Sequence, residues 1–335
     1  MRAVTDYKRT RASPTINKLT THFELSNLAD GKSESTITWY RDILKLFLRY
    51  LKEDRRSNSI DEFNIENARK YVLYLRSRSK FGKYANTQVQ HSTLSPQTVR
   101  GHIRGLKAFS SWLYREQYTT ENKLLNLKIP KVPVKLIEPL TDSEINQITS
   151  SINQDSPTGF RNHVIFVTAL DNGLRASEIA NINLGQLDLE KGFVKVMGKG
   201  SKERIVPIGD YVKMTLWAYI NKVRPEPTVT GYDNLFLSTT GEPITANTIK
   251  LVFSRLAKKS SVKRLHAHLC RHTFAINYLL NGGDIFSLRE ILGHTTLEMV
   301  NHYLHFTRSQ LTAQHHKYSP MDRLQKEQKV SKGKR

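Results

Sequence analysis

The proline-rich stretch at residues 128–140 constrains the fold of this 335-residue chain more than any other feature. It reads Lys-Ile-Pro-Lys-Val-Pro-Val-Lys-Leu-Ile-Glu-Pro-Leu. Its three prolines favour an extended linker, because proline lacks the backbone N–H that helices and inner strands need. A chain of this length also exceeds the size at which one hydrophobic core usually keeps growing. The sequence therefore predicts two domains, with a linker over residues 128–135.

Before the linker, apolar residues recur at helical spacing. One apolar stripe runs through Ser35–Glu53 and another through Ile65–Arg78. A further helix is predicted to begin at Ser95-Pro96, because serine caps a helix start and proline is tolerated at the first helical position. These patterns predict a helical domain over residues 16–127.

The chain is strongly basic, with 52 Lys and Arg against 30 Asp and Glu and a formal net charge of +22. Such a charge favours binding to a polyanion with release of counterions. Two of the predicted helices carry basic stripes beside their apolar ones, and a merely solvated face is the alternative explanation. We interpret the stripes as contacts to nucleic-acid phosphates. The residues concerned are Arg41, Lys45, Arg100, Arg104 and Lys107.

Several classes of function are disfavoured by composition. The sequence has no long apolar span and no signal-peptide core, so a membrane is not an expected partner. The single cysteine, Cys270, excludes an intrachain disulfide and a cysteine-based zinc site, and we expect a cytosolic protein. Cys270 itself is expected to be a small buried side chain rather than a nucleophile. No metal or other cofactor is expected, because no cysteine or carboxylate joins the histidine pairs His302/His305 and His315/His316.

Local signals after the linker predict a mixed domain. A capping-box sequence begins at Thr141, so this domain opens with a helix. Phe193–Met197 and Glu203–Pro207 are predicted to be the two strands of a hairpin with Lys199 at its tip. The rest is predicted to be mostly helical, with one more strand at Asn234–Ser238.

The same half carries a series of short motifs. It reads Gly-Leu-Arg-Ala-Ser-Glu, then Gly-Lys-Gly, then His-Leu-Cys-Arg-His, then Leu-Gly-His with a tyrosine nine residues later. In this order and spacing the motifs resemble the tyrosine recombinase (lambda-integrase) family. The resemblance implies a catalytic domain, here residues 136–320, between the linker and a disordered basic tail over residues 321–335; residues 1–15 are expected to be a flexible basic segment. The residues that match the family motifs are Arg175, Lys199, His268, Arg271, His294 and Tyr303.

Breaking a phosphodiester requires neutralisation of the phosphate, a nucleophile in line and a proton for the leaving oxygen. Guanidinium groups can bind phosphate bidentately where other enzymes use metal ions, so Arg175 and Arg271 are candidates for a phosphate clamp. By the resemblance, Tyr303 attacks phosphorus and forms a covalent 3′-phosphotyrosine, whose ester stores the bond energy so that no ATP is needed. Lys199 matches the family lysine that protonates the 5′ leaving oxygen.

Three more residues have supporting roles under the same resemblance. His268 would help to remove the proton of Tyr303, because a phenol has a pKa of about 10. His294 would hydrogen-bond the phosphate. Glu178, one helical turn after Arg175, would brace the site from behind the residues that contact phosphate. Two basic residues of the predicted hairpin complete the expected DNA-binding set: Lys202 and Arg204.

The resemblance implies a mainly α fold with a small antiparallel β-sheet, arranged as a two-domain C-shaped clamp on duplex DNA. A helical core-binding domain would grip one side of the DNA and the catalytic domain the other. The expected partners are double-stranded DNA recombination sites and three further copies of the chain, in a homotetramer joined by exchange of C-terminal helices. The expected reaction is site-specific recombination through a Holliday junction, for mobile-element integration, excision or transposition, or for dimer resolution.

Three alternative functions stay open at the level of sequence. A type IB topoisomerase uses the same phosphotyrosine step but changes the linking number of one duplex. A DNA-binding regulator could have the fold without catalysis, although all six motif positions here carry chemically competent side chains. A metal-dependent nuclease would lose its activity in EDTA.

Overall fold

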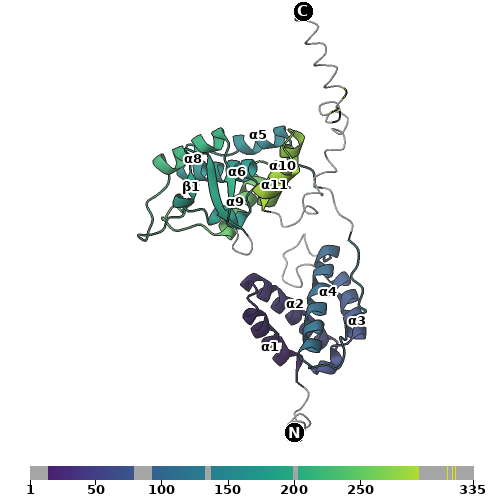
Figure 1. Ribbon diagram of the computed structural model, residues 1–335. Helices are drawn as coiled ribbons and strands as arrows, with labels where there is room; N and C mark the ends of the chain where they lie inside the picture. Colours follow the sequence, from purple (N-terminus) through teal and green to yellow (C-terminus); the bar gives the residue numbers. More distant parts are fainter. Residues whose placement is uncertain are drawn as a thin grey trace, which may run out of the picture. The chain divides into compact units, whose positions relative to one another are not determined.

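A computed structural model describes residues 14–78, 93–132, 137–198 and 203–293, together with residues 315, 319 and 321. It divides the chain into two compact units, Met1–Val134 and Lys135–Arg335 (Figure 1). The boundary between the units falls within the proline-rich stretch. Each unit has a hydrophobic core of its own.

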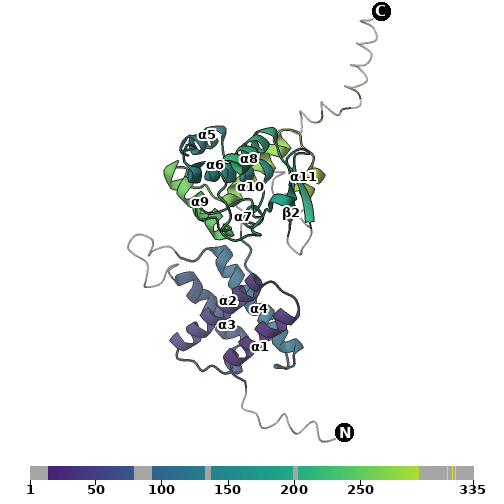
Figure 2. The same cartoon turned by 90° about the vertical axis from the view of Figure 1, so that its left-hand side faces the viewer.

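The first unit is helical, as predicted. The second and third helices match the predicted apolar stripes within two residues at either end, and the fourth begins at the predicted Pro96, where the Ser95 side chain accepts from the backbone N–H of Thr98. The first helix lies within the helical domain predicted over residues 16–127. The elements are α1 (Ile16–Ala29), α2 (Glu34–Glu53), the short 3₁₀ turn η2 (Ile60–Glu62), α3 (Ile65–Ser77) and α4 (Pro96–Arg115) (Figure 2).

A close approach of α2 and α4 holds this unit together. A Cβ atom at Gly105 would lie only 2.6 Å from Cδ1 of Ile43, so a larger residue there would require the Ile43 side chain to move. Around this crossing, aromatic rings meet edge to face, with Phe23–Phe109 and Phe47–Phe63 centroids 5.3 and 5.6 Å apart. The unit therefore has a single core to which each of its helices contributes.

The second unit is built mainly from helices. The predicted capping box is present at the first of them, where the Thr141 and Glu144 side chains each accept from the other residue's backbone N–H. The helices are α5 (Asp142–Ser150), α6 (Pro157–Asn172), α7 (Ala176–Ala180), α8 (Asp210–Lys222), α9 (Ala246–Lys259), α10 (Ala267–Leu280) and α11 (Ile285–Leu292), with a 3₁₀ turn η4 (Leu184–Gln186).

An antiparallel sheet completes this unit, with strand order β1 (Leu187–Asp188), β2 (Phe193–Met197) and β3 (Glu203–Pro207). The predicted hairpin strands are confirmed, with Val196 opposite Arg204 and Val194 opposite Val206. The predicted strand at Asn234–Ser238 is wrong, because this run forms only isolated bridges. The physical reason is that the Arg224 side chain takes the carbonyl oxygens of Asn234 and Leu235, which a strand would offer to a neighbour.

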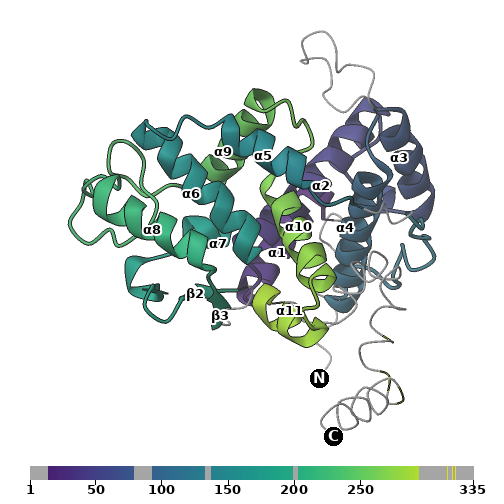
Figure 3. The same cartoon turned by 90° about the horizontal axis from the view of Figure 1, so that it is seen from above.

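Helix α6 lies at the centre of the second unit, with α8 and α10 packed along it (Figure 3). Seven of its consecutive residues, His163–Ala169, are buried, which is the pattern of a helix covered on all sides. The helix ends at Gly173, whose φ of +59° is the left-handed conformation typical of glycine after a helix. Across the residues that the structure describes, no helix is long and apolar enough to cross a membrane.

Candidate active site

The centre of the candidate site is the carboxylate of Glu178, whose side chain is 4% exposed. Its Oε1 accepts from Nη1 of Arg175 at 2.7 Å, and both of its oxygens accept from Arg204 at 2.9 Å. Nη1 of Arg271 lies 4.0 Å from Oε2 of the same carboxylate. Three guanidinium groups from distant parts of the sequence therefore converge on one buried negative charge.

These guanidiniums keep Glu178 ionised. Burial alone raises the pKa of its carboxyl, but the hydrogen bonds from Arg204 and from the backbone and side chain of Arg175 outweigh burial and lower the pKa to about 2. One negative charge then faces three positive ones among the described residues. The arrangement is suited to hold a further anion close to the arginines.

Arg175 is placed by the turn between α6 and α7. Its backbone is extended, and its N–H donates to Oε2 of Glu178 at 2.8 Å, so that the glutamate caps the helix start that Arg175 precedes. Its side chain is 32% exposed, which leaves part of the guanidinium accessible from outside. The expected proximity of Glu178 to Arg175 is thus observed.

Arg271 fastens the ends of two helices. It lies on α10, is 1% exposed, and donates from Nη1 to the carbonyl of Gly173 at 2.8 Å and from Nη2 to the carbonyl of Leu292 at 2.7 Å. Those carbonyls lie at the C-terminal ends of α6 and α11, where a positive charge is favourable. Only glycine fits the first end, because a Cβ at Gly173 would meet the Phe274 ring at 2.5 Å. Arg271 therefore sets the position of α11 relative to α6.

His268 lies one helical turn before Arg271 on the same helix. Its pKa is lowered, first by partial burial of the ring and then by the nearby charges of Arg271, His266 and Arg175. The neutral imidazole, which can accept a proton, is therefore favoured at neutral pH. His266, two residues earlier, instead stands at the start of α10 and contacts the backbone carbonyl of Arg264 through Nδ1 at 2.8 Å. Cys270 is fully buried, as expected, and burial raises the pKa of its thiol.

Four of the predicted site residues lie outside the described residues: Lys199, Lys202, His294 and Tyr303. The described chain stops one residue before Lys199 at the hairpin and one residue before His294 after α11. The histidines at positions 302, 305 and 316 also lie outside it. Within the described ranges, no group of three or more His, Cys, Asp or Glu side chains could hold a metal ion.

The predicted DNA-binding residues of the first unit differ in their environments. Arg41 forms an ion pair with Glu24 at 2.8 Å. The Lys107 ammonium donates to the carbonyls of Leu125 and Leu127, so it binds the segment that follows α4 and is not simply a solvated basic side chain. Lys45 and Arg104 are exposed, and among the described residues neither side chain has a hydrogen bond or an ion pair. Arg100 is half-buried, and its Nε has no hydrogen-bond partner there.

Arg204 is not placed as expected for a DNA-binding residue. Its side chain is 11% exposed, and its three guanidinium nitrogens donate to Glu178 and to the carbonyl of Ile291. Sequence reasoning missed this role, because the partners lie on segments far from Arg204 in the chain. The structure corrects the assignment: Arg204 is an internal brace.

Sequence reasoning also missed a basic cavity in the second unit. Its volume is about 620 Å³, and it lies between the exposed face of α9 and the segment that leads to α10. Three lysines and a histidine line it, and no acidic residue does so among the described residues: Lys250, Lys258, Lys263 and His266. The repeat of basic or hydroxyl residues at positions 250, 254 and 258 is helical spacing and could have been recognised in the sequence.

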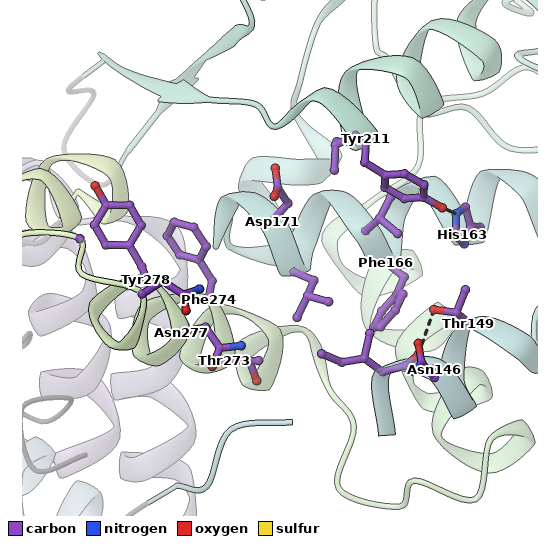
Figure 4. A pocket seen from close by; sticks show the side chains of 16 residues that line it. Asn146, Thr149, His163, Phe166, Asp171, Tyr211, Thr273, Phe274, Asn277 and Tyr278 are labelled. Atoms are coloured by element: carbon purple, nitrogen blue, oxygen red, sulfur yellow. Dashed lines mark hydrogen bonds between the residues drawn. The ribbon is translucent and has the colours of Figure 1, made fainter. Parts of the chain in front are cut away.

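A second cavity of about 720 Å³ lies between α5, α6, α8 and α10 (Figure 4). Its lining is mostly apolar, and Tyr211 contacts His163 through its hydroxyl at 3.1 Å. Among the described residues that line it, none belongs to the motif series. The candidate site is therefore the arginine cluster and not this larger cavity.

The fold and the arginine cluster define a class of protein, and comparison with known proteins gives its family. The sequence model of the Phage integrase family matches residues 138–310, more than half of the chain. The chain therefore belongs to this family and is a tyrosine site-specific recombinase.

Two curated relatives cover nearly the whole chain. Tyrosine recombinase XerD of Staphylococcus saprophyticus is 30% identical over 303 residues, which are 89% of this chain and 97% of the relative. Tyrosine recombinase XerC of Bacillus subtilis is 29% identical over 289 residues, 81% of this chain and 94% of the relative. The similarity extends beyond the motif half of the chain into its first unit.

Solved structures share the fold. The Tn1549 transposon integrase in complex with circular intermediate DNA has a TM-score of 0.67 at 23% identity, covering 93% of this chain and all of that one. A lambda integrase dimer bound to a COC′ core site has a TM-score of 0.67 at 17% identity, covering 90% of this chain and 81% of that one. The expected mainly α fold with a small antiparallel sheet is confirmed.

Proposed function

We propose that this recombinase cleaves and rejoins duplex DNA at specific sites through a covalent 3′-phosphotyrosine at Tyr303, without metal or ATP. The observation that carries the proposal is the convergence of Arg175 and Arg271 on Glu178, with His268 one turn away on α10. The partly exposed guanidinium of Arg175 can bind the non-bridging oxygens of a phosphate, and the buried Arg271, held by the carbonyls of Gly173 and Leu292, adds positive charge behind it.

In the cleavage step, the Tyr303 oxygen attacks phosphorus and the bond from phosphorus to the 5′ oxygen breaks. Neutral His268 takes the phenol proton, and Lys199 gives a proton to the departing 5′ oxygen. The arginines stabilise the charge that builds on the phosphate in the transition state. His294 adds a hydrogen bond to the same phosphate.

In the joining step, the 5′ hydroxyl of another strand attacks the phosphotyrosine and releases Tyr303. The phosphotyrosine ester preserves the energy of the broken phosphodiester bond. The free energy of strand exchange is therefore close to zero, and no nucleotide hydrolysis is needed. Two duplexes carry four such phosphates, so exchange through a Holliday junction requires four active sites. We therefore propose a homotetramer on DNA, with copies linked through their C-terminal segments.

We propose that both units contact DNA. The first unit would act as a core-binding domain through exposed basic side chains such as Lys45 and Arg104, and the second would act as the catalytic domain. The basic cavity with Lys250 and Lys258 offers phosphate contacts close to His266 and hence to the arginine cluster. The net charge of +22 supports the same partner, as do the DNA complexes of the Tn1549 and lambda integrases. Integration or excision of a mobile element, transposition and dimer resolution all fit this chemistry.

The test uses two duplexes that carry the same target site, one of them labelled, with the wild-type protein in EDTA. Target sites are first selected by sequencing joined ends in cells that express the protein. We expect labelled strands joined to the unlabelled duplex and a four-way junction on native gels. Relaxation of a supercoiled plasmid without strand exchange would indicate a topoisomerase, loss of cleavage in EDTA would indicate a metal nuclease, and binding without cleavage would indicate a regulator.

A further inference from the structure

Arg204 joins three segments that the motif series does not connect. It lies on β3, the second strand of the hairpin, and its side chain emerges on the buried face of the sheet opposite Val196. Nη1 and Nη2 donate to the two oxygens of Glu178 at 2.9 Å each, and Nε donates to the carbonyl of Ile291 at 2.7 Å. One side chain thus links the hairpin, the start of α7 and the end of α11.

The contact with α11 depends on a glycine. Gly293 follows α11 with a φ of +62°, and a Cβ there would lie 3.0 Å from Cδ and 3.1 Å from Nε of Arg204. The guanidinium therefore lies flat against the backbone at the point where the chain continues to His294. Only an arginine can make all three contacts, because lysine has a single nitrogen and no fork.

We propose that Arg204 is a positioning residue for the phosphate clamp: through Glu178 it sets the orientation of Arg175, and through Ile291 it fixes the end of α11. The inference rests on the proposed function, because it assigns Arg175 to the scissile phosphate. Arg204 does not contact DNA itself in this assignment, since each of its guanidinium nitrogens is already engaged within the protein.

The charge of Glu178 provides a signature of this role. Among the described residues, the charged groups that face its carboxylate are Arg175 at the start of α7, Arg204 on β3 and Arg271 on α10. Arg204 makes the largest contribution that lowers the Glu178 pKa, against burial, which raises it. Without Arg204 the carboxyl would be protonated at a higher pH, and a protonated Glu178 would hold Arg175 less firmly.

A matched control exists in the same unit. Arg264 also grips a glutamate with two nitrogens, Nε and Nη2 to Glu144 at 2.9 and 2.6 Å, and also donates to backbone carbonyls, those of Glu138 and Pro139. It links the segment before α10 to the first residues of the unit and does not contact the arginine cluster. Arg264→Met therefore reports what the loss of an equivalent structural contact does to folding.

The experiment measures single-turnover covalent trapping on a nicked suicide substrate at saturating protein, from about pH 5.5 to about pH 8.5, where a displaced carboxyl pKa becomes visible. Melting temperature and DNA affinity are measured alongside for the wild type, Arg204→Met, Arg204→Lys and Arg264→Met. We expect Arg204→Met to bind DNA normally but to cleave about 100-fold more slowly, the loss typical of a reacting group displaced by about 1 Å. Its rate relative to the wild type should fall further toward acid pH, and Arg204→Lys should lie in between.

Arg264→Met should lose similar thermal stability yet keep most of its cleavage rate. The inference is overturned if Arg204→Met cleaves as fast as Arg264→Met, or if its rate relative to the wild type is the same at every pH. Should Arg204→Met fail to fold, Arg204→Lys decides by the same two criteria. A wild-type protein that forms no covalent complex would overturn the proposed function itself, which is a distinct result.

Discussion

Replacing Glu178 with glutamine keeps the shape of the side chain but removes the charge that three arginines share. The folded protein lowers the Glu178 pKa from its usual 4.5 to about 2. At about 1.4 kcal/mol per tenfold change in proton affinity, this corresponds to about 3–4 kcal/mol in favour of the ionised form in the folded state. We expect Glu178→Gln to lose roughly that much stability at neutral pH, which lowers the melting temperature of a unit of this size by roughly 7–14 °C.

The pH dependence has a definite sign. Because the pKa is depressed in the folded protein, the stabilisation is fully present above pH 4.5 and is lost as the pH falls through 4.5 toward about 2. Calorimetry of wild type and Glu178→Gln should therefore show curves that approach each other in acid. Melting of the variant within about 1 °C of the wild type at neutral pH would mean that the carboxylate contributes well under 1 kcal/mol, and the account of the cluster would be refuted.

Three further results are expected. Gly293→Ala should destabilise the protein by about 1–2 kcal/mol in urea unfolding, the cost of a left-handed backbone for a residue with a Cβ. An unchanged midpoint would contradict the left-handed conformation of Gly293. His268 has a lowered pKa, so the wild-type cleavage rate should persist below pH 6.5 and fall only as the imidazole takes up a proton. A His268→Gln variant should cleave more slowly and should not show this fall in rate at acid pH. An identical fall in both proteins would exclude His268 as its source. Lys250→Gln with Lys258→Gln should weaken DNA binding and reduce the slope of log affinity against log salt by about 2, and the exposed Lys222→Gln serves as the control that should leave the slope unchanged.

Local signals allowed much of the fold to be predicted. The Ser95-Pro96 cap, the Thr141 capping box and the hairpin strands are each specified by a few adjacent residues, and each forms where expected. The strand predicted at Asn234–Ser238 fails because a side chain from another segment, Arg224, takes its carbonyls. Such competition depends on tertiary contacts that no short window of sequence contains.

The site follows the same division. Glu178 could be placed beside Arg175 because the two are three residues apart. Cys270 could be predicted to be a buried side chain rather than a nucleophile because free cysteine is small and usually buried. The contacts of Arg204 and Lys107 could not be predicted from charge patterns. In the sequence, a basic residue that binds carbonyls or a carboxylate inside the protein cannot be distinguished from one that faces DNA. The distinction becomes visible only when their partners are known.

The most direct test of the whole account is to identify the residue that becomes linked to DNA. The wild-type protein is incubated with a nicked suicide substrate in EDTA, the trapped complex is digested, and the DNA-bearing peptide is sequenced by mass spectrometry. The account predicts DNA attached through a 3′ phosphate to Tyr303 and no trapped complex for Tyr303→Phe. Attachment to another residue, or trapping that persists in Tyr303→Phe, would contradict it.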